Sequence, residues 1–309
     1  MTWQPYYVGD GVPREVELGD PPPWRSFPRQ NLHRQFQPPP GLTTAVNAAL
    51  ALRRPLLVTG PAGSGKSTVI EQVAAELKLG DPLRWHITSR STLTEALYRY
   101  DALGRIHAQR LPDGGDDIAP FLQLGPLGTA LLPSPRPRAL LIDEIDKSDL
   151  DLPSDLLDVL ERGVYEIPEL GRYTEDVVRV REWRSDVHTA IERGRVQCDQ
   201  FPFIVMTSNG ERDFPAAFLR RCIRFTMPRP TAEALRAVVE AHLGVVSDAG
   251  QAPVVDHLVE EFVTRVTAGG SLAVDQLLNA VHLLTGGSAL TDADRREVVE
   301  LVLRELSRA

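Results

Sequence analysis

The chain has 309 residues, of which 42% are hydrophobic and 25% are charged, and this composition excludes an intrinsically disordered protein. Its formal net charge of −8 provides no general attraction to nucleic acid, so we do not expect a nucleic-acid partner. The sequence has neither an apolar run of about 18 residues nor a secretory leader. We therefore expect no membrane association and a cytoplasmic location.

The first 40 residues are rich in proline, which removes backbone donors and breaks helices. This composition predicts an extended arm over residues 1–40 rather than a folded domain. The arm also carries aromatic residues, including Trp3, Trp24 and Phe36, which a purely disordered tail would lack. We expect it to lie along the body of the protein or along a neighbouring subunit.

Helical and strand patterns alternate in the next part of the chain. Helices are predicted over 42–52, 66–79 and 152–162, and buried strands over 55–59, 84–88, 140–142 and 203–206. The alternation predicts an α/β fold, with a parallel sheet flanked by helices, over residues 41–228. Beyond Pro228 and Pro230 only helical periodicity remains, so residues 229–309 are predicted to form a small all-helical lid domain.

Two connections in the α/β domain are long enough to be inserts, near 89–139 and 164–200. In the first insert we predict a helix over 93–100 and a short element over 121–132. In the second, 164–168 and 177–180 are predicted to pair as a hairpin, and 182–192 to form a helix.

A complete phosphate-loop motif, G-x-x-x-x-G-K-[ST], stands between the strand at 55–59 and the helix that follows it. Its glycines let backbone N–H groups close around phosphates, and the helix start attracts the anion. Lys66 is expected to reach the β- and γ-phosphates of ATP, and the Ser67 hydroxyl to coordinate Mg²⁺. The residues assigned to nucleotide binding are Gly60, Pro61, Ala62, Gly63, Ser64, Gly65, Lys66, Ser67 and Thr68.

The apolar strand at 140–142 ends in two carboxylates, Asp143 and Glu144. Ligands of open α/β sheets bind at the carboxyl ends of the strands, so both groups are expected at the nucleotide. We assign Asp143 to Mg²⁺ and Glu144 to the attacking water as general base.

These motifs resemble the AAA+ superfamily of ATPases. Residues 125–128 (GPLG) and 156–161 (LLDVLE), on either side of the acidic strand, are similar to the MoxR-like branch of that superfamily. The resemblance covers residues 40–228 well and the rest only loosely. It implies that the inserts contact a substrate, that the protein forms a homo-oligomer, usually a hexamer, and that its partner carries a von Willebrand A domain.

The resemblance also implies three further site residues. Asn209, at the end of the strand at 203–206, matches the family's polar sensor between the γ-phosphate and the water. Arg221, and as second choice Arg220, match the arginine finger that reaches a neighbouring subunit's site. The family often has a second sensor arginine at the start of a late lid helix, but 269–274 (GGSLAV) contains none.

The favoured function is Mg²⁺-dependent ATP hydrolysis by an oligomeric ring that remodels or chaperones a protein partner. The alternative is a slowly hydrolysing nucleotide-dependent switch or scaffold in a signalling or defence assembly, which the missing lid arginine favours and Glu144 opposes. A small-molecule kinase would need neither Asn209 nor the arginine pair. A GTPase is disfavoured because no N-K-x-D motif occurs, whereas a DNA-loading ATPase stays open.

Overall fold

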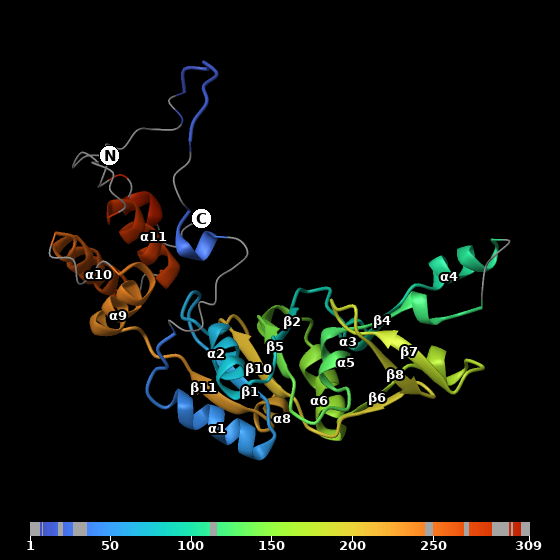
Figure 1. Ribbon diagram of the computed structural model, residues 1–309. Helices are drawn as coiled ribbons and strands as arrows, with labels where there is room; N and C mark the ends of the chain where they lie inside the picture. Colours follow the sequence, from blue (N-terminus) through green and yellow to red (C-terminus); the bar gives the residue numbers. More distant parts are fainter. Residues whose placement is uncertain are drawn as a thin grey trace. The chain divides into compact units, whose positions relative to one another are not determined.

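A parallel sheet of five strands forms the centre of the α/β part of the chain in the computed structural model (Figure 1). The structure describes residues 7, 9–17, 21–26, 36–111, 116–244, 250–268, 272–285, 297 and 299–303. The strand order is β11 (Ile223–Thr226), β1 (Leu56–Thr59), β10 (Phe203–Ser208), β5 (Ala139–Asp143) and β2 (Leu83–His86). The predicted α/β fold is therefore confirmed, and β11 is a strand that the sequence patterns did not predict.

The strands with long apolar runs, β10 and β5, lie inside this sheet, where both faces are covered. All six residues of β10 are buried, as are the first four of β5. Helix α1 (Leu42–Leu52) packs on β1 and β11, and α5 (Pro126–Ala130) packs on β2 and β5. The remaining helices of this part are α2 (Thr68–Leu77), α3 (Leu93–Leu97), α6 (Leu152–Arg162) and α8 (Ala216–Leu219).

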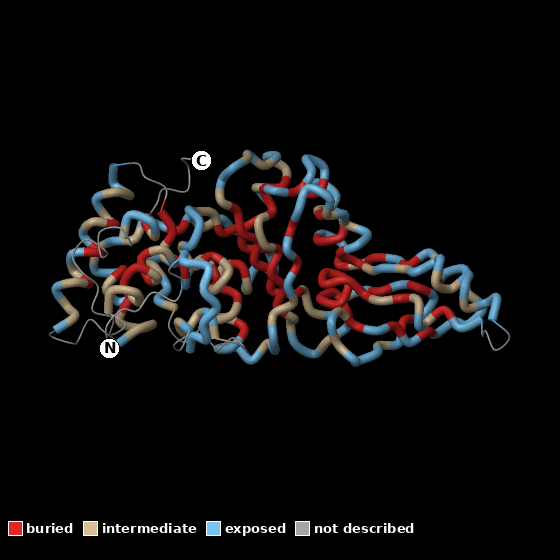
Figure 2. Tube along the Cα trace, turned by 90° about the horizontal axis from the view of Figure 1, so that it is seen from above, coloured by how far each residue is buried: buried red, intermediate tan, exposed pale blue. Residues whose placement is uncertain are grey.

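Segments of both inserts form a second sheet of six strands, which the sequence did not predict. Its order is β3 (Tyr98–Tyr100), β4 (Leu122–Leu124), β7 (Val177–Arg181), β8 (His188–Glu192), β9 (Arg195–Gln197) and β6 (Val164–Glu166). We call it the insert sheet. Buried and exposed residues alternate along β7 and along much of β8, so one face packs on the core and the other faces solvent (Figure 2). Short helices α4 (Ala102–Gln109) and α7 (Pro168–Gly171) accompany it.

Two predictions for the inserts are wrong, and a third is right only for the first part of its segment. The helix predicted over 93–100 ends at Leu97, and β3 follows it. The predicted 164–168 and 177–180 hairpin does not form, because β7 pairs with β8, the strand that follows it directly, and β6 pairs with β9. No helix forms over 182–192: residues 182–187 are turn and irregular structure, and 188–192 are β8, where the β-branched residues Thr189 and Ile191 favour an extended backbone.

The last part of the described chain is helical, as predicted. It contains α9 (Ala232–Leu243), α10 (Ala252–Thr267) and α11 (Val274–Thr285). Their apolar faces meet in one core, to which Leu235, Val239, Phe262, Leu277 and Val281 contribute. Residues 245–249, 269–271, 286–296, 298 and 304–309 of the predicted lid domain lie outside the described residues.

Residue contacts divide the chain into two compact units. One contains 40–59 and 69–226, which hold both sheets. The other contains 1–39, the phosphate loop with its flanks at 60–68, and 227–309. In the second unit the arm residue Trp24 donates its indole N–H to Asn279 Oδ1 at 3.0 Å, and its ring meets His242 and His282 edge-on. Within the described residues, no helix is long and apolar enough to cross a bilayer.

Candidate functional site

A buried hydroxyl on β10 joins the two carboxylates that end β5. The two strands run parallel, with Met206 opposite Ile142, so that Thr207 and Asp143 are neighbours across the sheet. Thr207 Oγ1 donates to Asp143 Oδ1 at 2.6 Å and accepts the Glu144 N–H at 2.9 Å. The side chain of Thr207 is only 1% exposed, which leaves no water to replace either bond. One threonine therefore holds Asp143 and the Glu144 backbone in register.

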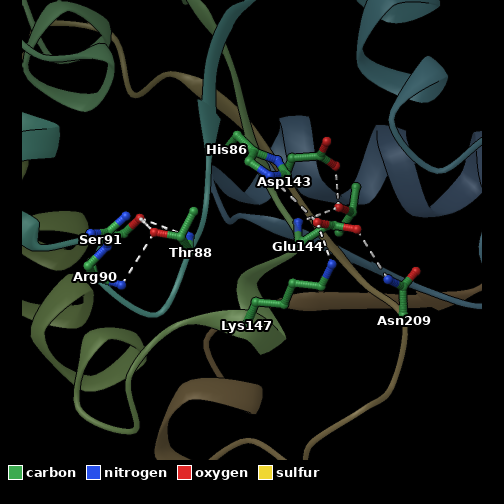
Figure 3. Close-up of polar contacts among 9 residues, drawn as sticks. His86, Thr88, Arg90, Ser91, Asp143, Glu144, Lys147 and Asn209 are labelled. Carbon is green, nitrogen blue, oxygen red and sulfur yellow. Dashed lines mark hydrogen bonds and ion pairs between the residues drawn. The ribbon is translucent and has the colours of Figure 1, made fainter.

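Glu144 stands at the centre of a polar cluster at this strand end (Figure 3). Its backbone is left-handed, with φ of 60° and ψ of 48°, an uncommon conformation for a glutamate that turns the chain sharply after the strand. The carboxylate accepts Lys147 Nζ at 2.9 Å and, weakly, Asn209 Nδ2 at 3.4 Å, while His86 Nε2 lies 3.8 Å away. The predicted base and the predicted sensor thus lie side by side.

The hydrogen bond to Glu144 raises the pKa of the Lys147 ammonium, which stays charged at neutral pH. Lys147 follows Glu144 by three residues, at the end of the short 3-10 helix Ile145–Lys147 that Glu144 precedes. A cation, an amide and an imidazole therefore surround one carboxylate. These groups orient the Glu144 side chain, and a proton acceptor must be held in such a defined position.

The neighbouring Asp146 fixes the loop that carries Asn209. Asp146 is 5% exposed, and its Oδ2 accepts the backbone N–H groups of Asn209 at 2.9 Å and Glu211 at 3.2 Å. Because a buried carboxylate needs such partners, the turn after β10 is tied to the segment after β5. The Asn209 amide, the predicted sensor, thereby gains a fixed position beside Glu144.

The phosphate loop belongs to the other unit and has the backbone that its motif requires. Gly60, Gly63 and Gly65 have backbone φ angles of 150°, 70° and 81°, which residues other than glycine rarely adopt. Lys66 is buried, and its Nζ donates to the carbonyls of Gly60 at 2.8 Å and Pro61 at 2.7 Å. The helix predicted from residue 66 begins at Thr68, whose N–H donates to the Gly65 carbonyl at 3.0 Å.

The two candidate finger arginines differ in their surroundings. Arg221 Nε forms an ion pair with Glu161 of α6 at 2.5 Å, and its Nη1 donates to the Ala217 carbonyl at 3.1 Å. The Arg220 side chain is exposed and has no hydrogen bond or ion pair with the described residues. Arg221 is therefore restrained by contacts within its own chain, whereas the Arg220 side chain is exposed to solvent.

Sequence reasoning missed Thr207, Lys147, Asp146 and Glu161 as members of these clusters. Thr207 could have been found, because residues two apart on a strand share a side and Asn209 was already assigned. The predicted metal ligands Ser67 and Asp143 both offer hard oxygen donors, which suit Mg²⁺. Among the described residues, no group of three or more His, Cys, Asp or Glu side chains is arranged to hold a metal ion.

Replacing Thr207 by valine should lower the free energy of unfolding by about 1–3 kcal/mol, since it leaves the Glu144 N–H and the Asp143 carboxylate without a buried partner. Serine keeps the hydroxyl, so Thr207→Ser should lose less. Urea denaturation measures both. Thr43→Val, the same exchange at an exposed helical position, should change stability by less than about 0.5 kcal/mol. Equal stability of the Thr207→Val and Thr43→Val proteins would contradict the role of the hydroxyl.

A phosphate loop between a buried strand and a helix, with an acidic strand end on the same parallel sheet, defines a phosphate-loop nucleotide-binding fold. The chain belongs to the AAA domain family (dynein-related subfamily), whose sequence profile matches residues 55–222.

Solved structures of two proteins are similar to the chain. A mutant of RuvB from Thermotoga maritima is 14% identical with a TM-score of 0.43, over 84% of this chain and 67% of RuvB. NtrX from Brucella abortus, in complex with ADP, is 15% identical with a TM-score of 0.42, over 84% of this chain and 52% of NtrX. Among curated proteins, none matches the chain.

Proposed function

We propose that the protein is a Mg²⁺-dependent ATPase of the MoxR-like branch that works as a homo-oligomeric ring on a protein partner. The observation that carries the proposal is the cluster around Glu144. The Glu144 carboxylate is held beside Asn209, and Asp143 accepts a hydrogen bond from Thr207 on the neighbouring strand. This arrangement provides the fixed proton acceptor that activation of water needs. An isolated acidic loop would not be tied in this way to the neighbouring strand.

Each part of the site has a role in this proposal. The loop over 60–68 binds the phosphates, and Lys66 exchanges its carbonyl partners for phosphate oxygens when ATP arrives. Ser67 and Asp143 would hold Mg²⁺, which neutralises charge on the phosphates. Glu144 accepts a proton from the attacking water, and the Asn209 amide orients that water.

The candidate finger arginines, Arg220 and Arg221, support the proposal of an oligomer. An arginine finger stabilises transition-state charge in the site of a neighbour, so it has a function only in an assembly. We infer a ring, with six subunits as the expected number. The apolar side chains of α4 support a protein partner, since Leu103 is 72% and Ile106 45% exposed. A von Willebrand A domain protein is the partner that the sequence resemblance suggests.

The alternative is a slowly hydrolysing switch. The described residues 272–276, which lead into α11, contain no arginine that could act as a second sensor. In addition, Lys147 and Asn209 both bind Glu144, so that its carboxylate is already engaged by protein groups. Both features favour low turnover.

ATP turnover per subunit, measured over a wide range of protein concentration, tests the proposal. We expect turnover to rise steeply with concentration, because each complete site needs two subunits. Size-exclusion chromatography with light scattering at the same concentrations would show whether the rise follows assembly. Low turnover that does not change between monomer and assembled states would favour the switch.

A further inference from the structure

The start of α11 lies directly against the phosphate loop. A Cβ placed on Gly63 would stand 2.7 Å from Ala273 Cβ and 3.0 Å from Asp275 Oδ1. These distances are shorter than ordinary van der Waals contacts, so the loop and the helix start touch. Both segments belong to the same compact unit.

The helix start is held in place by hydrogen bonds of its own. Ala273 donates its N–H to Gln276 Oε1 at 2.8 Å, and Gln276 Nε2 donates to the Val302 carbonyl at 3.0 Å. Leu277 and Leu278 are buried in the helical core just behind it. The position of Asp275 beside the loop is thus fixed by the packing of the lid.

Asp275 brings a negative charge to a loop that binds negative phosphates. Its carboxylate is exposed and forms no hydrogen bond or ion pair with the described residues, so no cation among them cancels its charge. A carboxylate in the first turn of a helix also interacts favourably with the helix dipole and so stabilises the helix. That effect explains an acidic residue in this turn, but it does not require contact with Gly63.

We propose that Asp275 limits the affinity of the phosphate loop for nucleoside di- and triphosphates by electrostatic repulsion. This inference rests on the proposed function and adds a regulatory element to its site. The carboxylate weakens binding in two ways: it repels the arriving phosphates, which slows association, and it destabilises the bound anion, which speeds dissociation. The lid would then promote release of product rather than hold it.

The repulsion predicts a specific pattern of affinities. Asp275→Asn removes the charge at nearly constant volume and should tighten binding of metal-free ADP about three- to tenfold at low salt. The gain should be smaller for ADP with Mg²⁺, which carries less negative charge, and absent for adenosine. It should also shrink as salt rises, because the groups are exposed and ions screen them.

Isothermal titration calorimetry of the full chain with ADP and adenosine measures this pattern without any need for turnover. Glu260→Gln is the matched control, because it removes the same charge from an exposed position of the same unit. Asp275→Ser provides a second uncharged variant if the asparagine protein folds poorly, and both should bind ADP alike. The off-rate of a fluorescent ADP should fall in parallel.

Two results would have different meanings. Unchanged or weaker ADP binding by both Asp275 variants, next to a wild type that binds ADP, would overturn this inference alone. Failure of the wild-type protein to bind either ADP or ATP would remove the proposed function itself.

Discussion

Glu144→Gln is expected to reduce ATP turnover at least a hundredfold while ATP still binds. A general base contributes about 10²–10⁴-fold to a rate, and glutamine cannot accept the proton. The amide has almost the same shape, and the Thr207 hydroxyl still anchors the backbone N–H of residue 144. Steady-state phosphate release measures turnover, and equilibrium binding of a fluorescent ATP analogue measures affinity.

Lys66→Ala should differ from Glu144→Gln by losing most of its ATP binding, because the phosphate loop loses its only lysine. Glu166→Gln is a suitable control, since this residue of β6 is exposed and its side chain has no hydrogen bond or ion pair with the described residues. It should hydrolyse ATP like the wild type. A Glu144→Gln protein with wild-type turnover would show that another group activates the water.

Lys147 should affect how well Glu144 activates water, because its ammonium donates the shorter of the two side-chain hydrogen bonds to the Glu144 carboxylate. For Glu144 to take a proton, its carboxylate must face the water rather than the lysine. The hydrogen bond that raises the pKa of Lys147 therefore also competes with catalysis. This competition is the physical basis on which the ATPase and switch proposals differ.

The central sheet could be predicted because each of its inner strands is buried on both faces. Such strands, including β5 and β10, appear in the sequence as uninterrupted apolar runs. β11 was missed because its four residues alternate between half-buried and exposed, without an apolar run.

The insert sheet could not be predicted, because its order depends on pairing between distant segments. β4 lies beside β7, although more than fifty residues separate them, and the two share a single paired position, Gln123 with Arg181. Strands of three to five residues carry too little periodicity to fix such a partner. Local patterns favoured a helix over 182–192, and tertiary pairing with β7 prevailed.

Motif residues of the candidate site were assigned correctly to strand ends, but their interactions were not foreseen. Asp143 and Glu144 follow the apolar run of β5, so their position was readable. The bond from Thr207 to Asp143 depends on the register between β10 and β5, which no single segment encodes. The same holds for the pair of Arg221 with Glu161, which joins α6 to the end of α8.

Loss of the arginine finger should lower ATP turnover about 10³-fold without weakening ATP binding to an isolated subunit, since the finger acts in a neighbour's site. Arg221→Ala and Arg220→Ala separate the two candidates. Glu161→Gln is the matched control for Arg221, because it breaks the ion pair and keeps the arginine. If Arg221 has only a structural role, Glu161→Gln should reproduce its loss.

Mixing two inactive proteins then decides whether the arginine acts between subunits. In a mixed ring, an Arg221→Ala subunit still offers an intact Glu144, and a neighbouring Glu144→Gln subunit still offers an intact Arg221. Such a junction contains one complete site, so turnover should reappear on mixing, up to about a quarter of the wild-type value for random assembly in equal amounts. An arginine that acts within its own subunit leaves every site incomplete, and the mixture would stay inactive. The same mixture made with Arg220→Ala shows which of the two side chains completes the site.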